Sequence, residues 1–410
     1  TLSECFSSRK IHIGMDEALM LGRGKHLDIH GYEPVNTIMK RHLERISKIA
    51  EKYDYELMIW SDMFFRPWNN GAYTIPKRDI PKDVIDSLPT NVTPVYWDYY
   101  QSKESTYSDM LENHKQLSNK TWFAGGSWCW LGFIPFNRFT LQSMIPAIDA
   151  CKKNQTKDII FTMWGDDGAE CSHFSQLPSL FYLAEYAKGN TDEASIKEKF
   201  KRFCGIDFDE FMNIDCPNEV LGYQGFPCNP SKYMLYSDCF NDYLDYTIKA
   251  GAGEKYKAYA ETLHATAKKS RKYGYIFKTA ASLCDVLEIK YELGLKTRTA
   301  YEAKDKAELR RLAENEYVEV RKRLLAFIKA FEKQWMADNK PHGFDVQESR
   351  LGALIYRLDS CRRRILKYAD GKIDRIEELD QELLPFREKE KSIEFNFALL
   401  NVTANSLHII

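Results

Sequence analysis

Five apolar segments in the first part of the chain share one plan, a run of large apolar side chains that ends beside an aromatic residue or an acid. They cover residues 10–17, 56–62, 92–100, 121–130 and 158–167. Continuous apolar runs of this length, bounded by Gly, Pro or acids, are typical of strands buried on both faces. Amphipathic segments separate several of them, most clearly at 35–53 and 141–154. Strands and helices that alternate in this way predict parallel strands joined by helical crossovers.

Acidic residues follow several of these runs at the point where the strand would stop. Asp16 and Glu17 follow the first run, and Asp62, Asp98 and Asp166 follow later ones. Active groups at the carboxyl ends of successive parallel strands are typical of a (β/α) barrel. We therefore predict an α/β fold whose first part is a (β/α)8-type TIM barrel.

The aromatic residues beside these acids favour a sugar site. A pyranose has an apolar face of C–H groups that stacks on Trp or Tyr, while its hydroxyls bind carboxylates. Each ring could instead fill a barrel core, and an Asp-Glu pair is more often solvated surface. The repetition of one chemistry at five strand ends favours the sugar site. Asp16 and Glu17 could then supply the charge stabiliser and proton donor that cleavage of a glycosidic bond needs.

Several motifs together resemble glycoside hydrolase family 20, the β-N-acetylhexosaminidases. They are His12-Ile13-Gly14-Met15-Asp16-Glu17 with Leu21-Gly22-Arg23-Gly24-Lys25 behind it, Trp60-Ser61-Asp62, Tyr96-Trp97-Asp98 and Trp164-Gly165-Asp166. The resemblance spans roughly residues 9–178. It implies hydrolysis of terminal β-linked N-acetylhexosamine from glycans by a retaining, substrate-assisted mechanism, through an oxazolinium-type intermediate.

The resemblance also implies roles for individual side chains. Glu17 would be the general acid and then the general base, Asp16 would hold the acetamido N–H, and Tyr96 would donate its hydroxyl to the acetamido oxygen. Asp166 stands where family members often carry Glu for an outer sugar hydroxyl, and Glu170 is the alternative residue for that role. Substrate-binding roles fall to Trp60, Asp62, Asp98, Trp128, Trp130, Trp164 and Asp166.

In family 20 the Asp-Glu strand is the fourth of eight, whereas here it begins at Lys10. The resemblance therefore implies an incomplete barrel, with strands 4–8 and without the first-strand Arg that would bind sugar hydroxyls. An open barrel exposes parallel edges that favour pairing, so we consider a homodimer. The alternative function is a non-catalytic amino-sugar-binding or structural fragment, with the activity belonging to a longer parent protein.

The second half of the chain shows helical rather than strand periodicity. Its clearest apolar face recurs every three to four residues at Val320, Leu324, Phe327, Phe331 and Trp335. Residues 255–293 and 352–384 behave similarly, and 213–231 is typical of an ordered loop. A helix break at 188–190 predicts the boundary between the barrel, residues 1–188, and an all-α domain, residues 189–410.

The composition limits the kinds of binding partner that we expect for this chain. The 58 basic and 59 acidic residues nearly balance, so we expect no nucleic-acid partner. We expect no membrane span, because the apolar runs fall short of about 18 residues. No motif predicts a cofactor or a metal, and the expected partner is a glycan with terminal β-GlcNAc or β-GalNAc. The ten cysteines favour free thiols and a cytoplasmic location. Disulfides among Cys204, Cys216, Cys228 and Cys239 are the alternative.

Overall fold

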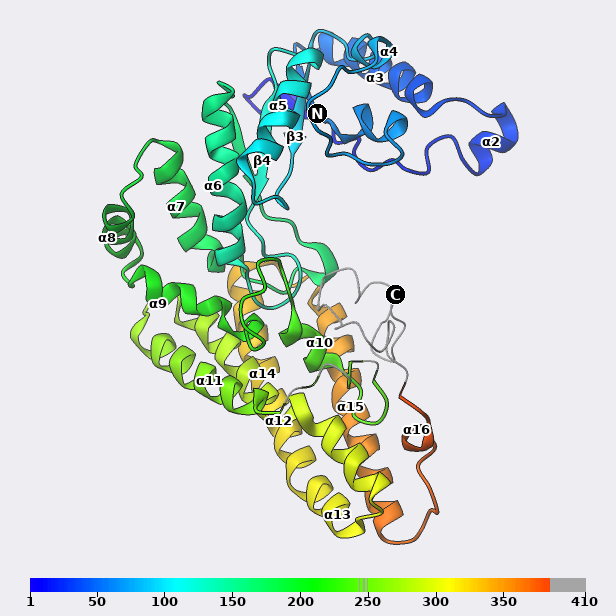
Figure 1. The fold of residues 1–410 in the computed structure, drawn as a ribbon, viewed down its shortest axis with the longest axis vertical. Coiled ribbons are helices and arrows are strands. Elements are labelled where there is room, and N and C mark those ends of the chain that lie inside the picture. The colour runs from blue at the N-terminus through cyan, green and yellow to red at the C-terminus, as the bar shows by residue number, and fades with distance from the viewer. Residues whose placement is uncertain (243, 246–247, 249, 384–410) are drawn as a thin grey trace. The chain divides into compact units, whose positions relative to one another are not determined.

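The computed structural model describes residues 1–383 except Tyr243, Tyr246, Thr247 and Lys249 (Figure 1). The protein is mostly helical and contains one five-stranded parallel sheet. Two compact units are distinguished. The first comprises Thr1–Ser127 and Thr140–Thr162, and the second comprises Trp128–Phe139 and the chain from Met163 onward.

The sheet belongs to the first unit and follows the order of the sequence. Its strands are β1 (Lys10–His12), β2 (Glu56–Trp60), β3 (Val92–Trp97), β4 (Trp122–Gly126) and β5 (Ile159–Thr162). Every neighbouring pair is parallel. The sheet is curled like half of a barrel, so the prediction of five parallel strands is confirmed and the architecture is compatible with an incomplete TIM barrel.

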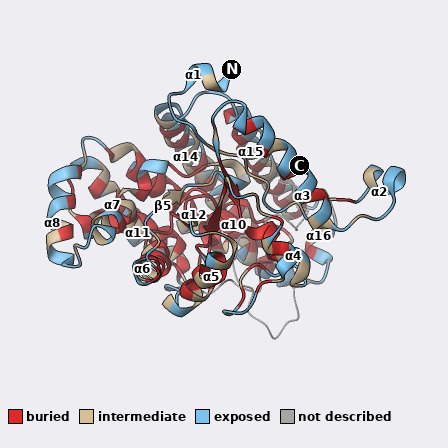
Figure 2. Cartoon of the chain, turned by 90° about the horizontal axis from the view of Figure 1, so that it is seen from above, coloured by how far each residue is buried: buried red, intermediate tan, exposed pale blue. Residues whose placement is uncertain are grey.

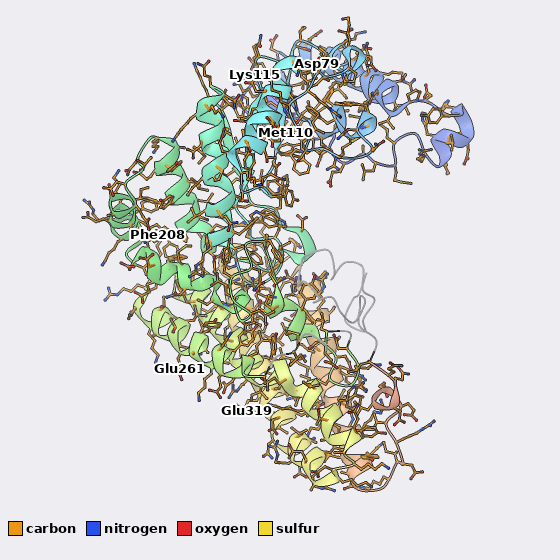
Figure 3. All side chains as sticks on the ribbon, viewed as in Figure 1. Asp79, Met110, Lys115, Phe208, Glu261 and Glu319 are labelled. Atoms are coloured by element: carbon orange, nitrogen blue, oxygen red, sulfur yellow. The ribbon has the colours of Figure 1, made fainter. Side chains whose placement is uncertain are left out.

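Helices join the strands as the crossover pattern predicted. Helix α3 (Val35–Glu51) packs on β2, and α5 (Glu104–Leu117) packs on β3. Met110 of α5, labelled in Figure 3, is fully buried, and its sulfur accepts the backbone N–H of Ile75 at 3.3 Å. The remaining helical segments here are α1 (Leu2–Cys5), α2 (Lys25–His30), η1 (Asp62–Phe64), η2 (Arg66–Trp68), α4 (Lys82–Ile85) and α6 (Asn137–Lys153).

The first strand is followed by the turn that carries Asp16 and Glu17, as the sequence predicted. β1 ends at His12, and the backbone then turns, with positive φ at Gly14 (70°), Met15 (70°) and Glu17 (48°). An extended strand cannot contain residues in the left-handed region. The two adjacent acids therefore lie on a loop beyond the strand.

The second unit is helical in its described part. Its elements are η3 (Asp166–Gly168), η4 (His173–Gln176), α7 (Leu177–Ala187), α8 (Glu193–Cys204), α9 (Phe208–Met212), η5 (Asn213–Asn218), α10 (Pro230–Tyr236), α11 (Ala252–Lys269), α12 (Gly274–Glu302), α13 (Lys306–Glu314), α14 (Glu316–Asp338), α15 (Phe344–Ala369) and α16 (Glu377–Asp380). Helix α8 shows the amphipathic pattern that holds such helices in place. Its buried side carries Ile196, Phe200 and Cys204, and its other side faces solvent (Figure 2).

The apolar face predicted over 320–335 is confirmed, because all five of its residues are buried in α14. The helical character predicted over 255–293 is confirmed, and the helical pattern predicted over 352–384 extends too far. Residues 255–293 form two helices, α11 and α12, separated at 270–273. The segment predicted over 352–384 leaves the helix after Ala369, where Gly371 adopts a φ of 72°, and its last residue lies outside the described residues.

The predicted loop 213–231 is only partly irregular, because η5 occupies its start and α10 begins near its end. The break at 188–190 is present between α7 and α8. The domain boundary placed there stays a prediction, and residues 384–410 of the predicted helical domain lie outside the described part.

All ten cysteines lie within the described residues and are free thiols, so the disulfide alternative was wrong. Eight of them are buried, as expected of thiols that behave as small apolar side chains. Among the helices that the structure describes, none combines the length and the apolar character that a membrane span requires.

Candidate active site

Asp62 holds the loop that carries the adjacent acids. Its side chain is fully buried just after β2, where Oδ2 accepts the backbone N–H of Glu17 at 3.0 Å and Nε of Arg66 at 3.0 Å. Nε1 of Trp97 donates to Oδ1 at 3.5 Å. Asp62 was predicted to bind substrate, and the structure places it beneath the Glu17 loop as the acceptor of three donors.

Arg66 forms ion pairs with both Asp62 and Glu17. Besides its bond to Asp62, its Nη2 lies 3.5 Å from Oε1 of Glu17, and its guanidinium lies over the rings of Tyr73 and Trp97. Burial raises the pKa of Asp62, while the Glu17 N–H and the Arg66 charge act in the opposite direction. A buried carboxyl that is paired and hydrogen-bonded in this way is a rigid support for the loop above it.

Glu17 itself is open to a ligand. Its side chain is 60% exposed, and Asp16 is also exposed. Met15 and Glu17 adopt left-handed backbone conformations that cost an L-residue about 1–2 kcal/mol each. Such strain persists where surrounding contacts enforce it, and it is frequent at functional sites. The bond from Asp62 to the Glu17 N–H is one contact that enforces it here.

Tyr96 and Asp98 are hydrogen-bonded to each other in the protein interior. The hydroxyl of Tyr96 donates to Oδ2 of Asp98 at 3.1 Å, and the Tyr96 ring packs against His114 and Phe123. Tyr96 is fully buried and Asp98 is 2% exposed. The ligand contacts that the resemblance implies for these two residues stay predictions, and they require the Tyr96–Asp98 pair to separate.

The buried carboxyl of Asp98 should make the free energy of unfolding depend on pH. Burial raises the pKa of Asp98 from 3.8 to about 6, although hydrogen bonds from Tyr100 N–H and the Tyr96 hydroxyl oppose the shift. The folded state then holds this proton more tightly than the unfolded chain, so the stability that Asp98 contributes is present below about pH 4 and is lost as pH rises through about 6. We expect this loss to be on the order of 2–3 kcal/mol in the free energy of unfolding.

Asp98→Asn cannot titrate and should lack this part of the pH dependence. Urea unfolding of both proteins between pH 4 and pH 7 measures the difference in slope. Equal slopes in the wild type and Asp98→Asn would contradict the expectation, whereas a uniform offset between them would reflect the substitution itself.

Trp60, another predicted substrate contact, is the last residue of β2. It is 9% exposed, and its ring centroid lies 4.2 Å from that of His12. Nδ1 of His12 accepts the backbone N–H of Gly14 at 3.1 Å, and burial lowers the pKa of His12 to about 4. His12 is therefore a neutral ring at neutral pH that supports the turn after β1.

The predicted aromatic residues of the second unit differ in exposure. Trp128 and Trp130 stack with centroids 4.3 Å apart and are almost completely buried. Trp164 is partly exposed, and its carbonyl accepts from the thiol of Cys129 at 3.6 Å. Asp166 is exposed at the start of η3. The thiol of Cys129 thus connects the Trp128–Trp130 segment with the segment that carries Trp164 and Asp166.

Glu170, the alternative to Asp166, is engaged in a buried ion pair. Its carboxylate is fully buried, with Oε1 2.8 Å from Nζ of Lys232 on α10 and 3.6 Å from Nη1 of Arg350 on α15. The side chain of Lys232 is only 2% exposed. Glu170 is therefore enclosed by helical residues, whereas Asp166 is exposed to solvent.

Two glutamines donate hydrogen bonds to backbone carbonyls of the segment that carries Asp166 and Glu170. Nε2 of Gln347 donates to the carbonyl of Gly168 at 3.0 Å, and Nε2 of Gln334 donates to the carbonyl of Glu170 at 3.1 Å. Gly168 has a φ of 121°, and a Cβ there would lie 2.7 Å from Nη1 of Arg350. The close approach of helical side chains therefore requires glycine at this position.

Sequence reasoning did not identify Arg66, Trp97 or Lys232 as members of these arrangements. Arg66 stands four residues after Asp62, a spacing that favours an ion pair on a helical turn, and this signal was available. Lys232 lies more than sixty residues from Glu170 along the chain, so no local pattern predicts their pairing. Among the described residues, no three His, Cys, Asp or Glu side chains group as ligands for a metal.

Comparison with known proteins supports a glycoside hydrolase. Residues 209–396 match the family model described as the Glycoside Hydrolase 20C C-terminal domain. This match supports membership of glycoside hydrolase family 20, and it lies outside the strand-end motifs that first suggested that family. No curated protein matches the chain.

Proposed function

We propose that this chain acts in the retaining, substrate-assisted hydrolysis of terminal β-linked N-acetylhexosamine, GlcNAc or GalNAc, from glycans. One observation carries the proposal. The Asp16–Glu17 loop follows a strand of a parallel half-barrel sheet in the same chain whose residues 209–396 match a glycoside hydrolase family 20 domain. The strand-end motifs and the helical match are separate parts of the chain that support the same family.

Glu17 is the proposed residue that donates a proton to the leaving group and later accepts one from water. Its carboxyl gives a proton to the leaving glycosidic oxygen while the acetamido oxygen of the substrate bonds to the anomeric carbon and the C–O bond breaks. Glu17 then accepts a proton from water, and that water's oxygen opens the oxazolinium ring at the anomeric carbon. Because the nucleophile is part of the substrate, it acts at a high effective concentration and no enzyme nucleophile is needed.

Asp16 would accept the acetamido N–H and balance the positive charge that develops on the ring. Asp62 and Arg66 support this step indirectly, because Asp62 holds the backbone of Glu17 and Arg66 neutralises Asp62. Tyr96 keeps its proposed contact with the acetamido oxygen. The proposed substrate-binding residues remain Trp60, Asp62, Asp98, Trp128, Trp130, Trp164 and Asp166.

Product stereochemistry tests the proposal directly. Hydrolysis of 4-nitrophenyl β-N-acetylglucosaminide, followed by proton NMR, should release the β-anomer first, and the matching β-glucoside without an acetamido group should not be turned over. Release of the α-anomer first, or equal turnover of the glucoside, would contradict substrate assistance. Binding of the N-acetylglucosaminide without turnover would instead support the alternative of a non-catalytic amino-sugar-binding protein.

A further inference from the structure

A hollow of about 550 Å³ lies on the helical elements, where the end of α11 and the start of α12 meet α14. Five of the residues that line it are small: Ala267, Ser270, Gly274, Ala330 and Ala337. A Cβ at Gly274 would lie 2.5 Å from the carbonyl oxygen of Ala267, so the two helices approach here because residue 274 is glycine. The hollow therefore results from close helix packing combined with short side chains.

Long cationic side chains line the same hollow. Lys268, Arg271, Lys278 and Lys333 are all exposed, and none forms an ion pair with any acid in the part of the chain that the structure describes. The described lining residues include no Asp or Glu.

Several cations elsewhere on the same helices are paired. On α14, Glu319 (labelled in Figure 3) binds both Lys322 and Arg323. Glu319 thus compensates two cations, whereas no acid forms an ion pair with the cations of the hollow in the described part of the chain.

Two acids contact residues that line the hollow. Oδ2 of Asp285 lies 2.8 Å from Nε2 of His264, and Oδ1 of Asp338 accepts the hydroxyl of Tyr275 at 2.6 Å. Nζ of Lys278 lies 3.4 Å from Nδ1 of His264, an arrangement in which His264 donates to Asp285 and accepts from Lys278. These two acids bond to His264 and Tyr275, and Lys268, Arg271 and Lys333 line the hollow without an ion pair to any described acid.

We propose that this hollow, the cationic groove, binds an anionic oligosaccharide through its sulfate or carboxylate groups. Lys and Arg form strong charge-assisted hydrogen bonds to oxyanions, and a concave surface lined by one sign of charge concentrates ligands of the opposite sign. The volume lies in the range of small-molecule sites. The partly exposed ring of Tyr275 adds an apolar surface suited to a pyranose face. None of the residues proposed for catalysis lines the groove.

Calorimetric titration of the full chain tests the groove without any assay of hydrolysis. The probes are a sulfated heparin-derived hexasaccharide, a hyaluronan hexasaccharide that carries only carboxylates, neutral chitohexaose, and a single-stranded DNA of similar charge. We expect at least one acidic hexasaccharide to bind, with an affinity that falls as salt is raised, and chitohexaose not to bind. The two acidic sugars distinguish sulfate from carboxylate as the recognised group.

Two charge-reversal variants separate the groove from general charge. Lys268→Glu with Arg271→Glu should weaken binding by about tenfold or more, because two charge-assisted contacts are lost. Lys257→Glu with Lys367→Glu makes the same change in net charge at exposed positions that do not line the groove, and it should bind like the wild type. Thermal unfolding of both variants checks that each is folded.

Three results would overturn the proposal. They are the absence of binding by both acidic hexasaccharides, equal loss of affinity in the two charge-reversal variants, and tighter binding of the DNA than of either sugar. Because hydrolysis is not measured, failure of the catalytic proposal would leave this result unaffected.

Discussion

Glu17→Gln should lower the turnover of an aryl β-N-acetylglucosaminide by about 10²–10⁴-fold, the usual contribution of a general acid–base residue. Gln keeps the shape of the side chain but can neither give a proton to the leaving oxygen nor take one from water. The loop should keep its conformation, since Asp62 accepts the backbone N–H of residue 17 rather than its side chain. The measurement is kcat for wild type and variant at saturating substrate.

The leaving group gives this prediction a second readout. An aryl oxygen that departs easily needs little protonation, so the loss for the first chemical step should be larger for a natural glycan than for a nitrophenyl glycoside. Glu44→Gln, at an exposed position on α3, serves as the matched control and should keep wild-type turnover. Near-normal turnover by Glu17→Gln with both substrates would remove Glu17 from the mechanism.

Lys232→Met should destabilise the folded protein by about 3–5 kcal/mol, the typical cost of breaking a buried ion pair from one side. Met approximates the length of the Lys side chain but removes the charge 2.8 Å from Glu170. The carboxylate of Glu170 would then stay fully buried with only Arg350, at 3.6 Å, as a cationic neighbour. Urea unfolding followed by circular dichroism reports the change, because this unit is helical.

A double variant distinguishes the ion pair from simple packing. Lys232→Met combined with Glu170→Gln removes both charges, so we expect it to recover much of the stability that Lys232→Met loses. If the double variant were as unstable as the sum of the two single variants, lost packing rather than an unpaired charge would be the cause. Hydrogen exchange at residues 165–169 should rise in Lys232→Met, since Glu170 fastens that segment.

The strands and most helices were predictable because local side-chain patterns encode them. Runs such as Leu57–Trp60 are apolar at every position, which suits a strand covered on both faces, and all four residues are buried. The face of α14 that includes Phe327 and Phe331 was predictable for the same reason, at helical spacing. Ends were less predictable, since single residues such as Gly371 decide where a helix stops.

The candidate site was predictable in its residue types and less so in its contacts. The sequence marks Asp62 and Asp98 as acids at strand ends, yet both are buried and hold neighbouring groups in the described structure. Asp16, Glu17 and Asp166 are the predicted site acids that remain accessible. Successive side chains of a strand point to opposite faces of the sheet, so a shift of one residue exchanges a ligand contact for a core contact. The residue order alone does not show which face the curled sheet encloses.

By itself, the sequence determined the alternation of strands and helices, the helical second half and the pairing of Asp16 with Glu17, because each depends on neighbours a few residues apart. Only the tertiary structure decided that Asp62 holds the Glu17 loop, that Lys232 neutralises Glu170, and that unpaired cations surround a hollow between α11, α12 and α14. These arrangements join residues far apart in the chain. They depend on the burial and distance that packing creates, which local sequence patterns do not contain.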